Sequence, residues 1–332
     1  MKKSIAFLLV ALLSMALVFG AIAEDPYADL PAVSVTCVSI MEPGTATIQA
    51  VEYMKNKIEE ATGGKFTITI LPSGQTGGEA EQAEALMVGE VEMLACGTLP
   101  IVTYTPEYGF FDCPFVFEGA EHMFNVWNGK IGDDLRAKLE TLGFHSLGMM
   151  GRGYRHISSN KAINSIDDMK GLVIRTPQGA TFVNTFSALG CITVPVALPE
   201  LFTALQSNVC EASEGPWDQL VTNKLYEVQK YIIESQYYYA TSTFFMNSDF
   251  YAGLPEAYQK LVTEVAAEAM EYGSNISKEM EAPLKQQCID AGVTILEMGD
   301  MTPYLEATKD TVAKFYEETW TVTTPEEIAS YK

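Results

Sequence analysis

The chain has 332 residues, a formal net charge of −22, and 48% hydrophobic against 19% charged residues. Such a composition excludes intrinsic disorder, and the acidity argues against nucleic acid or anionic membranes as partners. An acidic surface also repels anions at long range, so an anion site must work through local, partly desolvated contacts. The length predicts two lobes of ordinary size rather than one core.

The first residues have the features of a secretory leader. Lys2 and Lys3 precede an apolar run over residues 5–19, and residues 21–23 supply the small-x-small pattern of a cleavage site. We predict a signal peptide over residues 1–23 and a periplasmic mature protein whose charge, without the two lysines, moves from −22 to −24. An uncleaved N-terminal anchor is the alternative.

The next segments alternate between strand and helix patterns. In chain order, we expect a strand at 33–40, a helix with Ile48, Val51, Met54 and Ile58 on one face, a strand at 65–71, a helix at about 79–88 and a strand around 93–95. This βαβαβ order predicts a parallel sheet covered by helices.

The same alternation returns in the second half. We expect a strand at 171–175, a helix at about 180–189, an extended segment at 193–196, a helix from Pro199 to about Ser207, a strand at 209–214 and a helix reaching Tyr231. A long amphipathic helix begins near residue 254 and continues for some thirty residues, which suits a helix lying across both lobes. The predicted fold class is therefore α/β with two lobes.

Arg175 is the most informative single residue. It ends the short apolar strand at 171–174, and Thr176-Pro177 terminates that strand. Open α/β sheets bind ligands just beyond the carboxyl ends of their strands, and a buried guanidinium needs an anion. We therefore predict that Arg175 binds a ligand carboxylate; a structural ion pair within its own lobe is the alternative.

Other chemistry is poorly supported by the sequence. The six cysteines, at positions 37, 96, 113, 191, 210 and 288, lack a Cys-x-x-Cys spacing, so we expect small buried hydrophobes, with Cys191 and Cys210 as the pair to test. There is no Gly-x-Ser-x-Gly elbow, no phosphate loop and no metal-ligand spacing among the three histidines. We expect a binding protein, not an enzyme, without cofactor or metal.

Short motifs in a fixed order make the chain resemble the solute-binding proteins of tripartite ATP-independent periplasmic (TRAP) transporters. The motifs are Thr62-Gly63-Gly64-Lys65, Leu71-Pro72-Ser73-Gly74-Gln75, Pro106-Glu107, Cys113-Pro114-Phe115, Gly153-Tyr154-Arg155, Asn160 to Ile163, Asp168 to Arg175, Ala188-Leu189-Gly190, Pro199 to Gln206 and Tyr226-Glu227-Val228. The resemblance covers nearly the whole mature chain.

The resemblance implies a two-lobed periplasmic binding protein fold with hinge crossovers and one small organic acid held between the lobes. It implies that Arg175 clamps the ligand carboxylate, that Arg155 is a second ligand-binding arginine, and that the loaded protein docks on a TRAP membrane permease. We expect a monomer, with residues 24–152 and about 241–280 in lobe I, and 153–240 and about 281–332 in lobe II.

Three positions depart from sialic-acid-binding relatives. Gly215 stands where those relatives have an asparagine, Leu198 where they have an aromatic residue, and Gly97, beside Thr98, where they have an acid. These losses favour a monocarboxylate with an apolar or aromatic portion, such as a 2-oxo, 2-hydroxy or amino acid. A C4-dicarboxylate, a sugar acid, and a periplasmic sensor subunit with the same fold are the alternatives.

Three further side chains receive expected roles. Trp217 could fill the space above Gly215 as an aromatic wall for the ligand, with a packed core tryptophan as the alternative. Glu214 could pair with Arg155 and hold its guanidinium in place, and Arg152 is expected to be a surface or hinge charge.

Overall fold

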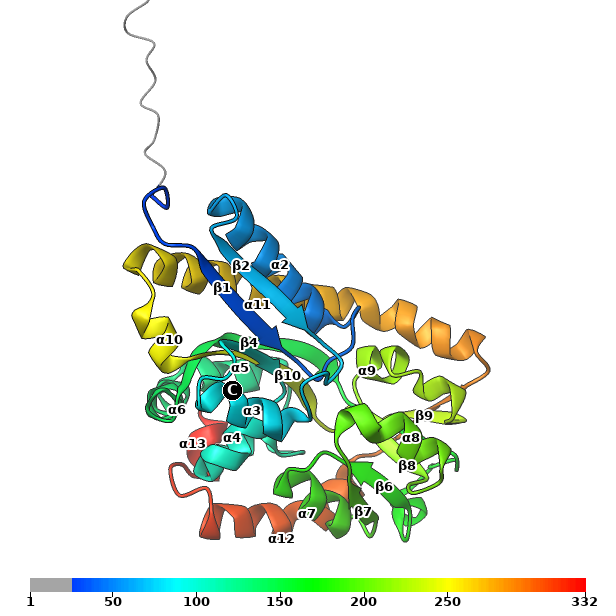
Figure 1. Cartoon of the computed structure of the whole chain (residues 1–332). Coiled ribbons are helices and arrows are strands. Elements are labelled where there is room, and N and C mark those ends of the chain that lie inside the picture. Colours follow the sequence, from blue (N-terminus) through cyan, green and yellow to red (C-terminus); the bar gives the residue numbers. More distant parts are fainter. Residues whose placement is uncertain (1–25) are drawn as a thin grey trace, which may run out of the picture.

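The protein is built around two β-sheets, one in each half of the molecule (Figure 1). The structure, a computed structural model, describes residues 26–332. The predicted signal peptide, residues 1–23, lies outside this range. None of the helices in residues 26–332 is both long and apolar enough to span a membrane.

The first sheet has the strand order β2-β1-β3-β10-β4. Strands β1 (Val33–Val38), β2 (Phe66–Leu71) and β3 (Met93–Cys96) are parallel, and α2 (Ala46–Ala61) and α3 (Glu79–Met87) connect them. The predicted βαβαβ unit is confirmed. Strand β10 (Tyr239–Asn247) pairs antiparallel with both β3 and β4 (Phe144–Tyr154), so the sheet is mixed. Neither antiparallel pairing was among the predicted elements.

Local chemistry explains where α2 begins and ends. The Thr45 side chain accepts a hydrogen bond from the backbone N–H of Ile48 at the N-terminus. At the other end, Gly63 and Gly64 adopt positive φ angles of 57° and 81°, which glycine tolerates best. The apolar face predicted for this helix is buried against the first sheet.

A helical segment connects β3 to β4. It consists of α4 (Leu99–Tyr104), the 3₁₀ helix η1 (Pro106–Asp112), α5 (Ala120–Asn128) and α6 (Lys130–Thr141). Phe110 and Phe111 from η1 are fully buried in the largest hydrophobic cluster, as expected for core residues. This segment places Asp112 next to the junction of the two halves.

The second sheet has the order β11-β9-β5-β8-β6-β7. Its strands are β5 (His156–Ser159), β6 (Val173–Thr176), β7 (Ile192–Pro195), β8 (Ala212–Gly215), β9 (Tyr231–Glu234) and β11 (Thr294–Glu297). The helices of this half are η2 (Ile166–Met169), α7 (Ala180–Ala188), η3 (Leu198–Glu200), α8 (Leu201–Gln206), α9 (Trp217–Thr222) and η4 (Leu225–Glu227). The predicted helix reaching Tyr231 was wrong: α9 ends at Thr222, and Lys224 takes a left-handed conformation that interrupts the helix.

Two of the segments that connect the halves lie next to each other. One is Arg155, between β4 and β5, and the other is residues 235–238, between β9 and β10. The backbone N–H of Arg155 donates to the carbonyl of Tyr238 at 2.9 Å, and the Ser235 hydroxyl donates to the Arg155 carbonyl at 3.2 Å. Side chains on these crossovers therefore lie where the two halves meet.

The long helix α11 (Glu256–Asp290) follows α10 (Ser248–Gly253) and runs across both halves, as predicted (Figure 1). It packs on α2 and β4 of the first half and on α9 of the second. Lys285, near its end, pairs with Glu234 at 2.6 Å. After β11, α12 (Thr302–Glu318) packs on α7, and α13 (Pro325–Ala329) returns to the first half, where the Ile328 carbonyl lies 2.8 Å from His122 Nε2.

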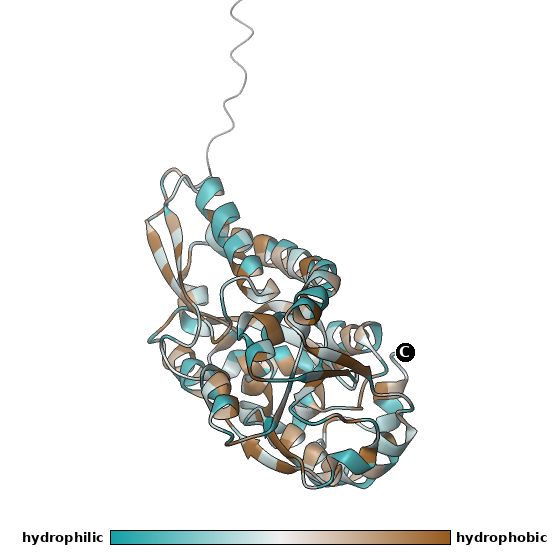
Figure 2. Ribbon diagram, turned by 90° about the vertical axis from the view of Figure 1, so that its right-hand side faces the viewer, coloured by the Kyte–Doolittle hydropathy of each residue, from teal (hydrophilic) through white to brown (hydrophobic). Residues whose placement is uncertain are grey.

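Hydrophobic residues concentrate on the central strands, and the outer helices carry hydrophilic stretches (Figure 2). All six cysteines are buried and unpaired, which confirms that they act as small core residues. Cys191 and Cys210 form no disulfide.

Candidate ligand-binding site

A cavity of about 60 Å³ lies between the two halves, beyond the carboxyl ends of β1, β3 and β6. This is the position at which open α/β sheets hold ligands. Its lining comes from the first half (Ile40, Met41, Glu79, Gly97, Thr98, Leu99, Asp112, Arg152, Ala240, Thr241), from the second half (Arg175, Pro177, Phe182, Leu198, Gln219) and from the crossovers (Arg155, Tyr238).

Arg175 lies at the end of β6, is only 3% exposed, and lines this cavity. Its Nε donates to the Val196 carbonyl at 2.8 Å, which fixes the plane of the guanidinium. Among the described residues, the terminal nitrogens make only one ion contact, at 3.8 Å between Nη1 and Glu214 Oε1. They remain available as two parallel donors, the geometry that binds a carboxylate.

The electrostatics of Arg175 agree with this geometry. Burial lowers the pKa of its guanidinium to about 10, with a further lowering by Arg155 and an opposing effect of the Glu214 charge. The group stays protonated at neutral pH, but its charge is not fully compensated within the protein. A ligand anion would supply the missing compensation.

Arg155 has a different role in the structure because Glu214 already occupies its donors. Nε and Nη2 of Arg155 both donate to the Glu214 carboxylate, and Tyr237 Oη donates to Glu214 Oε2. Burial lowers the pKa of Arg155, but the charge of Glu214 and its hydrogen bonds outweigh burial and raise the pKa overall. The expected Arg155–Glu214 pair is therefore present, and the pair holds a guanidinium at the cavity wall.

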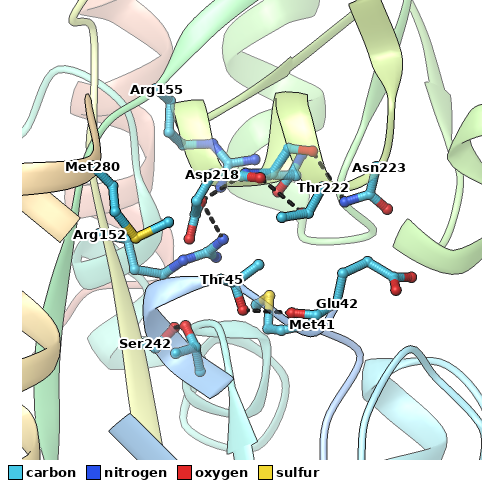
Figure 3. Close-up of polar contacts among 12 residues, drawn as sticks. Met41, Glu42, Thr45, Arg152, Arg155, Asp218, Thr222, Asn223, Ser242 and Met280 are labelled. Atoms are coloured by element: carbon cyan, nitrogen blue, oxygen red, sulfur yellow. Dashed lines mark hydrogen bonds and ion pairs between the residues drawn. The ribbon is translucent and has the colours of Figure 1, made fainter. Parts of the chain in front are cut away.

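Arg152 is buried, at 3% exposure, so the expectation of a surface charge was wrong, whereas its place near the crossover between the halves agrees with the hinge alternative. It lies on β4 and its Nη2 donates to Asp218 Oδ1 at 3.0 Å across the junction of the halves (Figure 3). Arg152 Nε and Asp218 Oδ2 are buried without a partner among the described residues. The partner that explains its burial, Asp218 at the start of α9, belongs to the other half and cannot be read from local sequence.

Two acidic side chains also line the cavity, Glu79 at the start of α3 and Asp112 at the end of η1. Burial raises the pKa of Asp112 to about 7, against the lowering effect of the Thr98 hydroxyl that donates to it. Burial also raises the pKa of Glu79, whereas the Gly97 backbone and the three arginines lower it. Asp112 can therefore exchange a proton near neutral pH, and the pKa of Glu79 is shifted in the same direction.

Gly215 and Trp217 are not among the residues that line the cavity, which favours the alternative of a packed core tryptophan over an aromatic wall. A Cβ placed on Gly215 would lie 2.4 Å from Nε2 of Gln219, so the Gln219 side chain fills the space above this glycine. Gln219 donates to the Glu214 carbonyl at 3.0 Å and faces the cavity. Trp217 instead packs against His156, with ring centroids 4.9 Å apart, in the hydrophobic core of the second half.

The remaining predicted residues do line the cavity. Leu198 provides part of its apolar wall and is 6% exposed. Gly97 follows β3, and a Cβ there would lie 3.0 Å from Glu79 Oε1, so the missing side chain makes room for Glu79. Thr98 holds Asp112 through its hydroxyl.

Sequence reasoning missed Glu79, Asp112, Arg152, Gln219 and Tyr238 as cavity residues. A weak signal existed for two of them. Glu79 opens a helix after a predicted strand and turn, and Asp112 immediately precedes the Cys113-Pro114-Phe115 motif. The others gave no local signal.

Comparisons with known proteins agree on one family. The family model described as bacterial extracellular solute-binding protein, family 7, matches residues 37–319. The C4-dicarboxylate-binding periplasmic protein DctP of Rhodobacter capsulatus is 29% identical over 259 residues, which cover 77% of each chain.

Solved structures give the same result. A TRAP periplasmic solute-binding protein from Polaromonas, bound to D-erythronate, has a TM-score of 0.84 at 26% identity and covers 90% of this chain and 98% of its own. A second, from Pseudomonas putida with bound D-glucuronate, has a TM-score of 0.83 at 25% identity and covers 90% and 97%. The two-lobed fold predicted for the chain is confirmed.

Proposed function

Because the chain belongs to the TRAP solute-binding proteins, family 7 of the bacterial extracellular solute-binding proteins, we propose that it captures one small organic acid outside the cytoplasm and delivers it to a TRAP permease. The cavity between the halves is the proposed binding site. Arg175, Arg155, Glu214, Gly97, Thr98 and Leu198 remain in the proposed site, whereas Gly215 and Trp217 do not line the cavity.

The relatives support one part of the proposal, the class of acid. They are a C4-dicarboxylate-binding protein and structures holding D-erythronate and D-glucuronate. A sugar acid or a C4-dicarboxylate is therefore better supported than the expected monocarboxylate with an apolar or aromatic portion. The placement of Trp217 away from the cavity weakens the aromatic version further.

One observation carries the proposal: Arg175 is buried, protonated and only partly paired, at the wall of a cavity. Its neighbour Arg155 is neutralised by Glu214, and Arg152 by Asp218. The carboxylate of a ligand would complete the charge balance and meet two parallel N–H donors. Removal of water on closure strengthens such an ion pair because the effective dielectric falls.

Contacts between the halves indicate how binding could produce a signal. Pro199 of the second half lies against the turn at Gly74 of the first, where an added Cβ would come within 2.4 Å of the Pro199 ring. Gly179, which precedes α7 of the second half, lies against Asp112 of the first half. A Cβ added to Gly179 would lie 3.2 Å from Asp112 Oδ2. A ligand bound between the halves would favour this closed arrangement by its differential affinity for it. A permease could then distinguish loaded from empty protein by shape.

The test is titration calorimetry of the mature protein against a broad panel of organic acids. For the tightest acid, Arg175→Ala should weaken binding about thirtyfold or more, since stranding a buried carboxylate costs at least about 2 kcal/mol. Arg175→Lys should restore only part of this loss, because a point charge cannot replace the planar fork. Arg136→Ala, at a surface arginine paired with Asp133, is the matched control and should leave affinity unchanged. If no acid binds, or Arg175→Ala binds as tightly as the unaltered protein, the proposal fails.

A further inference from the structure

The charges around the cavity narrow the class of acid, an inference that rests on the proposed function. Three arginines line the cavity, and two of them have a dedicated carboxylate: Arg155 has Glu214, and Arg152 has Asp218. The cavity lining, within the described residues, contains no lysine. Arg175 is therefore the cation left to receive a ligand, and it can neutralise one carboxylate.

Glu79 faces the same cavity with an oxygen that has no protein partner. Its Oε1 is buried and lacks a hydrogen bond within residues 26–332. The oxygen lies above Gly97, where a Cβ would come within 3.0 Å, so the absence of a side chain at Gly97 creates its position. Arg175 and Glu79 lie close enough for each charge to shift the other's pKa. A buried acceptor without a partner, on a side chain that lines a cavity, calls for a ligand donor.

Asp112 adds a second carboxyl on the same side. The hydroxyl of Thr98 donates to Oδ1, and the hydroxyl of Thr181, from α7 of the other half, donates to Oδ2 at 3.5 Å. Gly179 also lies close to Asp112 Oδ2, and a Cβ at this position would be in tight contact with that oxygen, at 3.2 Å. Asp112 is thus held in place from both halves while still lining the cavity.

We infer that the cavity is built for a hydroxylated monocarboxylate, with its carboxylate on Arg175 and its hydroxyl groups hydrogen-bonded to Glu79 and Asp112. Hydroxyl groups can donate to these carboxyls or accept from them, so one hydroxyl can satisfy the unpartnered Glu79 Oε1 and another can use the remaining acceptor capacity of Asp112. The second carboxylate of a dicarboxylate would instead meet two acids and no free cation. Like charges at such short range in a desolvated site repel strongly.

The protonation of Asp112 makes the selection between monocarboxylates and dicarboxylates depend on pH. Asp112 faces Thr98, Thr181, Tyr238 and Cys113 and feels the charges of Arg155, Glu79 and Glu214, and burial raises its pKa to about 7. Glu79 feels the charges of Arg152, Arg155 and Arg175, faces the Gly97 backbone and lies near the Cys96 thiol, and burial raises its pKa. Above about pH 7 the Asp112 carboxyl is ionised and repels a second ligand carboxylate; as the pH falls below about 7 Asp112 takes up a proton and this repulsion weakens.

The experiment compares acids of equal chain length on the same protein. Titration calorimetry at about pH 8 with D-erythronate against succinate, and D-gluconate against D-glucarate, should show the monocarboxylate of at least one pair bound about tenfold tighter or more than its dicarboxylate partner. Lowering the pH to about 6.5 should narrow that gap by improving dicarboxylate binding.

Glu79→Gln and Asp112→Asn should each shrink the ratio of the monocarboxylate affinity to the dicarboxylate affinity by about fivefold or more at the higher pH. Asp112→Asn should also flatten the pH dependence of this ratio. Glu84→Gln, at an exposed acid on the same helix, is the matched control and should leave the ratio unchanged. A ratio of affinities measured on one variant cancels any general loss of folded protein.

The inference is overturned if the dicarboxylate binds as tightly as its partner at the higher pH, if both variants keep the unaltered ratio, or if no hydroxylated acid in the four-ligand panel binds. These outcomes differ from those that would refute the proposed function. The proposed function fails only if no acid of the broad panel binds, or if Arg175→Ala binds as tightly as the unaltered protein. Succinate bound tightly through Arg175, for example, would overturn this inference and leave the proposed function intact.

Discussion

Glu214 should be the most costly single residue to neutralise in this protein. The carboxylate is fully buried on β8 and accepts two hydrogen bonds from Arg155 and one from Tyr237. Glu214→Gln keeps the shape but removes the charge, and it turns an amide N–H toward the Arg155 donors. Breaking a buried pair from one side strands the other charge, so we expect a loss of about 3–5 kcal/mol in the free energy of unfolding.

The assay is urea unfolding of the mature protein, with the midpoint and slope compared between variants. Glu211→Gln provides a matched control, because Glu211 lies just before the same strand and pairs with the exposed Lys161 at 2.8 Å. That surface pair should be worth less than about 1 kcal/mol. Replacing both partners, Arg155→Met with Glu214→Gln, should cost less than the sum of the single changes. If Glu214→Gln costs no more than Glu211→Gln, the reasoning about a buried, charge-balancing pair is refuted.

Gly74→Ala places a Cβ against Pro199 across the cleft and should weaken ligand affinity about tenfold, because it opposes the closed arrangement. Gly63→Ala is the matched control, because it carries the same penalty of about 1–2 kcal/mol for a positive φ but its added Cβ has no neighbour within 4 Å. The ligand affinity of this variant, measured by calorimetry, should stay unchanged. Burial raises the pKa of Asp112 to about 7, so the folded protein holds a proton that the unfolded chain releases near pH ~4. The free energy of unfolding, measured in urea, should therefore fall as the pH rises from about 4 to about 7, by at most about 1.4 kcal/mol per pH unit. Asp112→Asn should make this dependence on pH less steep. The same dependence in both proteins would contradict the assignment to Asp112.

The sequence carried enough information for the parts of the fold that depend on local patterns. The strands and helices from residue 33 to residue 96 follow apolar periodicity and glycine stops, and the structure has them within a few residues. Arg175 was found in the same way, because the end of a parallel strand is both a sequence feature and a fixed place in a sheet.

The rest of the site depends on contacts between distant segments. Trp217 and Gln219 are two residues apart on α9, so they project to different faces, and which face meets the cavity is set by the packing of α9 on α11. Asp112 reaches the cavity through a helical segment whose path no periodicity reveals. Arg152 could be recognised as buried only once Asp218 was known to lie opposite it.

The central claim is that Arg175 holds the ligand carboxylate between the two halves, and a crystal structure of the complex with the tightest acid tests it most directly. The account predicts both carboxylate oxygens within about 3 Å of the terminal nitrogens of Arg175, with Arg155 still bound to Glu214. A ligand carboxylate held by any other group, with Arg175 turned toward Glu214 alone, would contradict it.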